Sequence, residues 1–148
     1  MNKSICLLLI SFSLTLTNCH SQTHYIKADT SNIDKEELSF AKSLSNKILT
    51  EQKNGGYYVL SNEEATAKMT EGLNESLQKK SYQQIKSMFG DYKDLKFESL
   101  MIGTKGNKYS IYRFKGNFDS NSDVEIRAVL DQQKKLAGFF IKPWKENL

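Results

Sequence analysis

The side chains best suited to nucleophilic catalysis or to metal binding are confined to the first 24 residues of this 148-residue chain. The two cysteines are Cys6 and Cys19, and the two histidines are His20 and His24. Ser-His and Cys-His catalysis needs an imidazole base, and thiolate or imidazole metal sites need the same residue types. The sequence therefore excludes these chemistries from residues 25–148 within one chain, and we expect neither a metal site nor a bound cofactor.

Carboxylates are the remaining candidates for acid-base chemistry. Asp119 and Asp123 flank Ser-Asn-Ser at a spacing that resembles part of a calcium loop, but the glycine and the bidentate glutamate of an EF-hand do not follow. We therefore expect a plain hairpin turn there. Asp131 precedes a polar turn, where aspartates are commonly solvated. The polar residues inside apolar strand faces are Arg113 and Arg127, and neither is a carboxylate whose pKa burial could raise. We predict that the protein is not an enzyme.

Aromatic residues are the stronger indication of a binding surface, because such side chains can line an apolar pocket or a partner surface. The candidates for contact with a ligand or partner are Tyr57, Tyr58, Tyr112, Phe140 and Trp144. The alternative is that these rings fill the core of a small domain. Trp144 follows Pro143, and it could either seal the edge of a sheet or anchor a partner.

The N-terminus has the pattern of an export signal. A short basic head, residues 1–4, precedes about 12 mostly apolar residues, which is too short for a membrane span of roughly 20 residues. The following Leu16-Thr17-Asn18-Cys19 resembles the lipobox of bacterial lipoproteins, with a Cys-x-Ser-Gln context similar to the Bacteroidetes type. This resemblance implies cleavage before Cys19 and acylation of its sulfur, and each buried methylene would contribute about 0.8 kcal/mol to anchoring.

The alternative for Cys19 is a residue that merely marks the end of a signal peptide. On the lipoprotein interpretation, the chain is exported and binds the lipid bilayer through acylated Cys19, at the periplasmic or surface face of an outer membrane. Residues 1–18 are then the signal peptide, residues 19–34 a flexible polar tether, and residues 35–148 one domain. His20 and His24 would lie in this tether, where weak chelation of a metal is the alternative to a solvated segment.

The charge pattern argues against nucleic acid as a partner. Lys and Arg total 21 against 17 Asp and Glu, and the basic residues are scattered rather than gathered in a stripe. Partner classes that remain open are a protein, a peptide or a small ligand.

Helical spacing and capping signals dominate residues 34–90. A helix is predicted over about 34–52, with Asp34 as its N-cap and an Asn-Gly-Gly stop at 54–56. Residues 57–60 could form a brief strand or a packing loop. Capping boxes beginning at Ser61 and Ser81 predict two further helices that meet near Lys80, and Gly90 occupies the position of a C-terminal cap.

After Gly90 the apolar pattern changes to the two-residue period of strands. The predicted strands span residues 95–102, 108–118, 123–131 and 135–142, and the short turns between them require antiparallel neighbours. Val124, Ile126, Ala128 and Leu130 alternate with Glu125, Arg127 and Asp131, which predicts one buried and one largely wet face. The expected fold class is α+β, with N-terminal helices packed on one face of a curved four-stranded antiparallel sheet.

Four segments of this domain resemble the family of secreted bacterial domains DUF3887. They are residues 85–92, 112–116, 124–131 and 135–143, which include a helix-ending Phe-Gly and a final Leu-Ala-Gly-Phe-Phe strand. The similarity covers roughly residues 35–145 and implies a cystatin-like or NTF2-like fold in an exported protein, without a known catalytic set. The sequence departs from a full NTF2-like cone, because the region between the first helices and the sheet is short, so we do not expect a deep pocket.

The sequence therefore predicts a membrane-anchored envelope lipoprotein with a non-enzymatic binding or interaction role. Two alternatives stay open. One is an NTF2-like enzyme that uses carboxylate or tyrosine acid-base chemistry, and the other is a purely structural component of the envelope. An open pocket on the concave sheet face would favour the enzyme, whereas filling of that face by Met88, Phe89 and Phe114 would disfavour it.

Overall fold

The structure is a computed structural model that describes residues 25–106, 108–120 and 122–146. In these ranges the chain forms five strands, three α-helices and one short 3-10 turn. Their order is β1 (Tyr25–Lys27), the 3-10 turn (Thr30–Asn32), α1 (Lys35–Lys53), α2 (Ala67–Gly72), α3 (Glu75–Phe89), β2 (Tyr92–Gly103), β3 (Ser110–Phe118), β4 (Val124–Leu130) and β5 (Leu136–Pro143).

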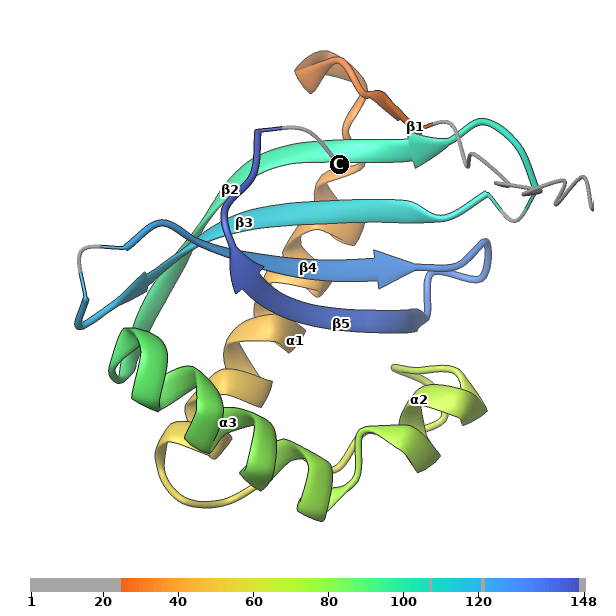
Figure 1. Cartoon of the computed structure of the whole chain (residues 1–148). Helices are drawn as coiled ribbons and strands as arrows, with labels where there is room; N and C mark the ends of the chain where they lie inside the picture. Colours follow the sequence, from red (N-terminus) through yellow and green to blue (C-terminus); the bar gives the residue numbers. More distant parts are fainter. Residues whose placement is uncertain (1–24, 107, 121, 147–148) are drawn as a thin grey trace, which may run out of the picture.

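The strands form one antiparallel sheet in the order β1-β2-β3-β4-β5. In Figure 1, α1 passes behind the curved sheet, whereas α2 and α3 lie below β5. The register of β2 against β3 shifts between Tyr92 and Asp94 and again between Phe97 and Ser99, and such bulges increase the bend and twist of a strand. The predicted α+β class with an antiparallel sheet is confirmed. Of the predicted helices, α1 packs on one face of the sheet, whereas α2 and α3 lie beside its β5 edge (Figure 1).

The prediction of four strands is wrong, because the sheet begins before the first helix. Tyr25, Ile26 and Lys27 pair with Gly103, Ile102 and Met101 of β2. Ala28 continues this edge by donating its N–H to the carbonyl of Leu100 at 2.9 Å. Residues 25–34 therefore include a strand and a 3-10 turn within the segment predicted as a flexible tether. A three-residue strand is too short to show an alternating pattern.

The first helix and its cap agree with the prediction. Asp34 accepts hydrogen bonds from the N–H groups of Glu36 at 2.9 Å and Glu37 at 3.2 Å, which satisfies two free donors of the first turn. The helix ends at Lys53, and Gly55 follows with φ +83°. Residues 57–60 form a loop without strand pairing, so the second of the two alternatives for this segment is the correct one.

The predicted boundary between the second and third helices is wrong. Ser61 and Glu64 exchange the hydrogen bonds of a capping box, but they do so in a turn, and α2 begins only after the N-cap Thr66. The break between helices lies at Asn74, which caps α3 by accepting from the N–H of Leu77 at 3.0 Å. Ser81 therefore lies inside α3 and does not cap it, because Asn74 is the N-cap of this helix.

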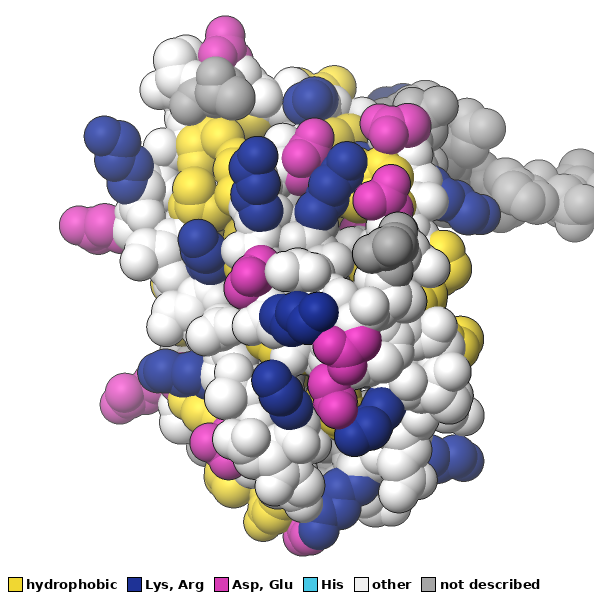
Figure 2. Space-filling model, turned by 90° about the vertical axis from the view of Figure 1, so that its left-hand side faces the viewer, with side chains coloured by type: hydrophobic (Ala, Val, Ile, Leu, Met, Phe, Trp, Pro, Cys, Tyr) yellow, Lys and Arg dark blue, Asp and Glu magenta, His cyan; other side chains and the backbone are white. Residues whose placement is uncertain are grey.

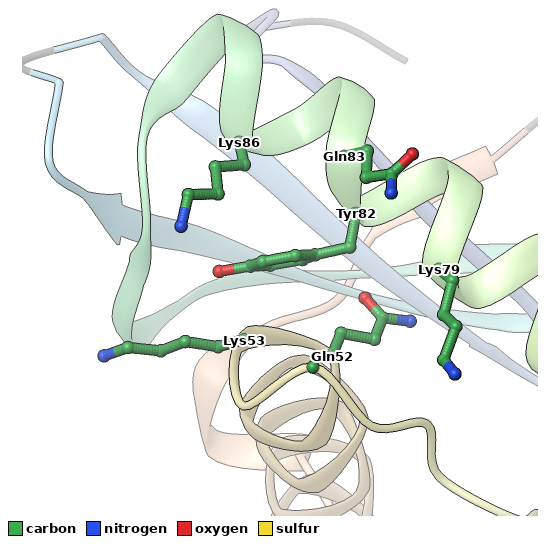
Figure 3. A pocket seen from close by; sticks show the side chains of 7 residues that line it. Gln52, Lys53, Lys79, Tyr82, Gln83 and Lys86 are labelled. Carbon is green, nitrogen blue, oxygen red and sulfur yellow. The ribbon is translucent and has the colours of Figure 1, made fainter.

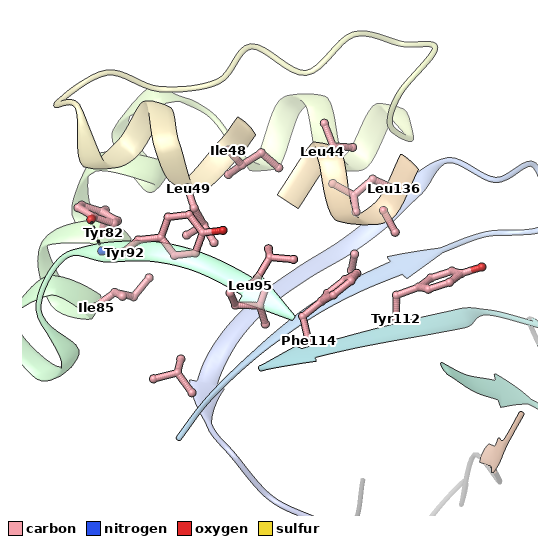
Figure 4. Packing of buried hydrophobic residues seen from close by; sticks show 14 of the residues in the cluster. Leu44, Ile48, Leu49, Tyr82, Ile85, Tyr92, Leu95, Tyr112, Phe114 and Leu136 are labelled. Carbon is pink, nitrogen blue, oxygen red and sulfur yellow. Dashed lines mark hydrogen bonds between the residues drawn. The ribbon is translucent and has the colours of Figure 1, made fainter. Parts of the chain in front are cut away.

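The concave face of the sheet holds the hydrophobic core. Leu44, Ile48 and Leu49 of α1 point onto this face, where they meet residues of the strands such as Leu95 and Phe114 (Figure 4). Full burial of one such side chain contributes about 1.5–3 kcal/mol. Tyr82 and Ile85 of α3 extend the same core toward Tyr92, whose N–H donates to the Tyr82 hydroxyl at 3.2 Å.

Gly90 makes the turn from α3 into β2 possible. Its φ of +80° and ψ of −163° lie in a region that is essentially accessible to glycine alone. A Cβ atom at this position would lie 2.5 Å from the Cβ of Asp119. Asp119 cannot simply move away, because its carboxylate accepts from the N–H of Asp91 at 2.9 Å and pairs with Lys93 at 3.1 Å.

We predict that Gly90→Ala lowers the free energy of unfolding by about 3 kcal/mol, since it combines backbone strain with a steric clash. Gly55→Ala is the matched control, because Gly55 has φ +83° but no atom within 4 Å of the added Cβ. It should cost only about 1–2 kcal/mol. Urea denaturation of both variants measures the difference, and equal losses would contradict the role assigned to Asp119.

Candidate functional site

The concave face of the sheet is filled by side chains. Of the three residues named as possible filling, Phe89 and Phe114 are buried there, together with Tyr112, but Met88 is 59% exposed. The helix α1 supplies the rest of the filling with Leu44 and Ile48. The concave face of the sheet is therefore occupied by the protein's own core.

The five aromatic candidates do not gather on one surface of the described chain. Tyr112 is fully buried on β3, where its hydroxyl donates to Glu37 of α1 at 3.0 Å. Tyr57 and Tyr58 lie in the loop after α1, and the Tyr58 hydroxyl donates to Glu64 at 2.7 Å. This hydrogen bond raises the pKa of Tyr58 to about 12, so the group is neutral near pH 7. Phe140, on β5, is 55% exposed.

Trp144 belongs to a short segment that crosses the convex face of the sheet, the face turned away from α1. We name residues 144–146, which follow β5, the C-terminal strap; in Figure 1 the chain after β5 passes in front of the sheet. The N–H of Trp144 donates to the carbonyl of Asp123 at 2.9 Å. The Arg113 guanidinium lies 4.4 Å from the centre of the indole ring and the Lys115 ammonium 5.0 Å from it, both at cation–π distance. Trp144 therefore covers the sheet face.

Beneath the strap, one buried carboxylate binds two arginines. Glu125 of β4 is fully buried, and its Oε1 accepts from Nε of Arg113 and from Nε of Arg127, each at 2.6 Å. Arg127 also donates through Nη2 to Oε2 of Glu125 at 3.3 Å. The Lys142 ammonium of β5 lies 3.7 Å from the same Oε2. We name these four residues the Glu125 cluster.

The wet convex face predicted from the alternation in β4 is wrong at the Glu125 cluster. Arg113 and Arg127 are directly paired across β3 and β4, an arrangement of like charges that is unfavourable without a shared anion. Arg113 uses its remaining nitrogens on the strap, donating to the carbonyls of Lys145 and Glu146. The strap thus removes from water a face that the sequence pattern assigns to solvent.

The charges of the cluster are coupled. Burial alone would raise the pKa of Glu125, but the hydrogen bonds from Arg113 and Arg127 outweigh burial and hold this pKa below its ordinary value. Glu125 is therefore an anion rather than a store for a proton. Burial and the neighbouring charge of Arg127 lower the pKa of Lys142. Three cations share one carboxylate, so the site keeps an excess of positive charge.

An open groove lies between α3 and β5, with a volume of about 350 Å³. Its walls include Leu77, Ile85 and Met88 from α3 and Phe139, Phe140 and Lys142 from β5. Leu77 is 45% exposed, Met88 59% and Phe140 55%, although all three are large apolar side chains. We name this feature the α3–β5 groove, and exposed apolar walls of this kind are typical of binding surfaces.

Lys142 connects the groove to the Glu125 cluster, because it lines the former and belongs to the latter. Its cross-strand partner on β4 is Glu125, and that of Phe140 is Arg127. The most exposed ring of β5 therefore lies beside two cations. The groove is lined mostly by apolar side chains and is positively charged at this side.

A second pocket, of about 310 Å³, lies between the end of α1 and α3. Figure 3 shows Lys53, Lys79 and Lys86 around the ring of Tyr82 in this pocket. Two of the lysines are already neutralised, since Lys79 pairs with Glu75 at 2.6 Å and Lys86 with Asp91 at 2.9 Å. This pocket is a weaker candidate for an anion than the groove.

The three aspartates that the sequence offered as candidates make hydrogen bonds in the loops around the sheet. Asp119 caps the turn into β2 as described above, and Asp123 supplies its carbonyl to Trp144. Asp131 closes the last hairpin by accepting from the N–H groups of Gln133 at 2.9 Å and Lys135 at 3.0 Å. Within residues 25–106, 108–120 and 122–146, no three His, Cys, Asp or Glu side chains come close enough together to hold a metal ion.

Charges of both signs are mixed on one side of the molecule. On the side of the molecule shown in Figure 2, Lys and Arg alternate with Asp and Glu, and no continuous field of one sign forms. In the described part of the chain no helix has both the length and the apolar character needed to cross a membrane.

Comparison with known proteins gives no match to a protein-family model, to a curated protein or to a solved structure. The resemblance to DUF3887 therefore stays a prediction from the sequence. The function has to be inferred from the groove, the Glu125 cluster and the N-terminal motif.

We predict that Glu125→Gln lowers the free energy of unfolding at pH 7 by about 3–5 kcal/mol, because two buried guanidinium groups lose their counter-charge. Glu98→Gln, which changes an exposed carboxylate of β2, should cost less than about 0.5 kcal/mol. Chemical denaturation of both variants measures these losses.

The loss of stability in Glu125→Gln should depend on pH. Because folding lowers the pKa of Glu125, its contribution is complete above the unfolded value of about 4.3 and is lost as pH falls through the folded value. The stability gap between wild type and Glu125→Gln should therefore narrow on acidification. A gap that stays constant from pH 7 to pH 3 would show that Glu125 is not ionised in the folded protein.

Proposed function

We propose that this protein is an exported, lipid-anchored envelope protein without catalytic activity, whose α3–β5 groove binds a partner. The observation that carries the binding role is the exposure of Leu77, Met88 and Phe140 along one groove. Burial of such side chains against a partner contributes about 25 cal/mol of binding free energy for each Å² of apolar surface taken from water. The filled concave face supports a surface groove rather than an internal pocket as the binding site.

The anchor is proposed from the sequence around Cys19. Its lipobox-like context and the preceding apolar run support export followed by acylation. We also propose that the domain belongs to the cystatin-like or NTF2-like group and is similar to DUF3887. The support is its order of helices followed by an antiparallel meander, together with the segments quoted above.

The anchor has a direct test. We expect Cys19→Ala to move the protein from the membrane fraction to the soluble fraction while leaving the folded domain intact, because Cys19 precedes the first described strand by six positions. Membrane fractionation with radiolabelled palmitate measures both location and acylation. Equal membrane retention of the variant and the wild type would overturn the proposal.

The groove has a separate test in the full-length chain. We replace Leu77 or Phe140 with the photo-crosslinking residue p-benzoylphenylalanine and irradiate cells that make the protein. Both positions should give the same light-dependent adduct of higher mass, since their side chains lie on opposite walls of one groove.

Lys42, an exposed residue of α1, is the matched control position and should give no such adduct. Adducts that are identical from all three positions would indicate non-specific crowding. The absence of any adduct from the two groove positions would instead favour a purely structural component of the envelope.

A further inference from the structure

The strand β5 forms an edge of the sheet that is only partly covered. Ala65 makes an isolated parallel bridge with Leu136, in which Leu136 donates to the carbonyl of Glu64 at 2.9 Å and accepts from the N–H of Thr66 at 3.0 Å. The chain then turns away into α2. Among the described residues, these are the backbone groups that pair with this side of β5.

Residues 138–143 therefore continue an edge to which a parallel segment is already added at one end. Alternate residues of an edge strand direct their N–H and C=O groups to the open side, where an extended peptide can bind them. Six residues of strand span about 20 Å. The α3–β5 groove runs beside this length, so side chains of an added strand would meet the apolar wall formed by Leu77, Met88 and Phe140.

The direction of an added strand follows from the bridge at Leu136. A peptide that continues the parallel direction of residues 64–66 runs from the start of β5 toward Pro143. Its C-terminal end then lies beside Lys142. Pro143 has no N–H group, so β5 offers no further donor beyond that point.

The charge at that end fits an anion. Arg113, Arg127 and Lys142 share the single carboxylate of Glu125, and Lys145 follows on the strap. Lys142 is the accessible member of the cluster, with 36% of its side chain exposed against 15% for Arg127 and 4% for Arg113. A carboxylate beside Lys142 would offset an excess of positive charge that the fold already holds.

We propose that the partner is the extended C-terminal segment of a protein, with alternating apolar side chains, which adds to β5 as a sixth, parallel strand and places its terminal carboxylate at Lys142. This rests on the groove being the binding site. Backbone hydrogen bonds supply sequence-independent affinity, the groove selects apolar side chains, and Lys142 selects a free chain end.

The test uses the full domain and a defined probe. A fluorescein-labelled peptide Gly-Ser-Lys-Thr-Val-Thr-Val-Thr-Val with a free C-terminal carboxylate should bind saturably with one site, as measured by fluorescence polarisation. The same peptide as a C-terminal amide should bind about tenfold more weakly, which corresponds to the loss of about 1.4 kcal/mol. The same sequence with all six Thr and Val residues N-methylated, which has no N–H group on either edge of this stretch and so cannot add as a strand, should not bind.

Substitutions in the protein separate the two halves of the proposal. Lys142→Gln should weaken the free-acid peptide to the affinity of the amide and leave the amide unchanged, and Lys142→Arg should restore binding while preserving the Glu125 cluster. Phe140→Ser should weaken both peptides. Lys42→Gln, on α1, should change neither. Nuclear magnetic resonance should place the shifted amide signals on β5 and not on the other sheet edge, β1.

Several results would overturn the proposal. Equal affinity of the acid and the amide would show that the terminal carboxylate is not recognised. Equal affinity of the N-methylated and unmodified peptides would show that the peptide does not add as a strand. Amide shifts at β1, or no saturable binding up to 1 mM, would reject the β5 edge. Laurate, an amphiphile with a carboxylate but no N–H groups, should not displace the probe, and tight laurate binding would indicate a lipid ligand instead. If these tests fail while groove crosslinks form, the proposed function stands and only the class of partner is wrong.

Discussion

A curved sheet has two faces, and in this protein the helices cover only the concave one. The convex face is organised by one anion, Glu125, which holds two paired arginines together and thereby orients Arg113 toward the carbonyls of the C-terminal strap. A buried ion pair adds little net stability compared with apolar residues of the same volume, because both charges lose their water. What this one supplies is position: it fixes the strap, seats Trp144 over the sheet, and leaves Lys142 at the rim of the α3–β5 groove.

The filled concave face and the open groove are two results of the same packing. Because α1 places Leu44 and Ile48 directly on the sheet, α3 is displaced to the side and contacts the core through Tyr82 and Ile85. One face of α3 and one edge of the sheet then border each other, and among the described residues the groove between them is open. The described concave face is thus filled, and the groove at the surface is where we propose that a partner binds.

Local signals predicted the elements of the fold better than their limits. Asp34 caps α1 as its position predicts, and Gly90 ends α3 because no other residue tolerates its backbone angles. The capping box at Ser61 forms its reciprocal hydrogen bonds, yet the following residues turn away to meet Leu136, which is a contact that no local pattern contains. The short strand at Tyr25 was missed for the same reason, since its partner lies 78 positions further along the chain at Gly103.

The candidate site is the part of the structure that the sequence predicted least well. Alternation in β4 assigns Glu125 to solvent, and only the simultaneous presence of Arg113 on another strand and of the strap makes its burial favourable. Phe140 and Trp144 were found as aromatic candidates near the end of the last strand, but the sequence could not tell that one is exposed and the other covers Arg113. The groove itself depends on the angle between α3 and β5, which is a property of the whole core.

If Cys19 is acylated as proposed, the place of β1 bears on the orientation of the domain. Six positions separate Cys19 from Tyr25, and an extended chain spans at most about 3.6 Å per residue, so an acylated Cys19 would keep the β1 edge within roughly 20 Å of the lipid headgroups. Four steps of about 4.8 Å separate β1 from β5 at the opposite edge. A domain held by its first strand in this way would turn its last strand away from the bilayer, toward whatever approaches from the aqueous side.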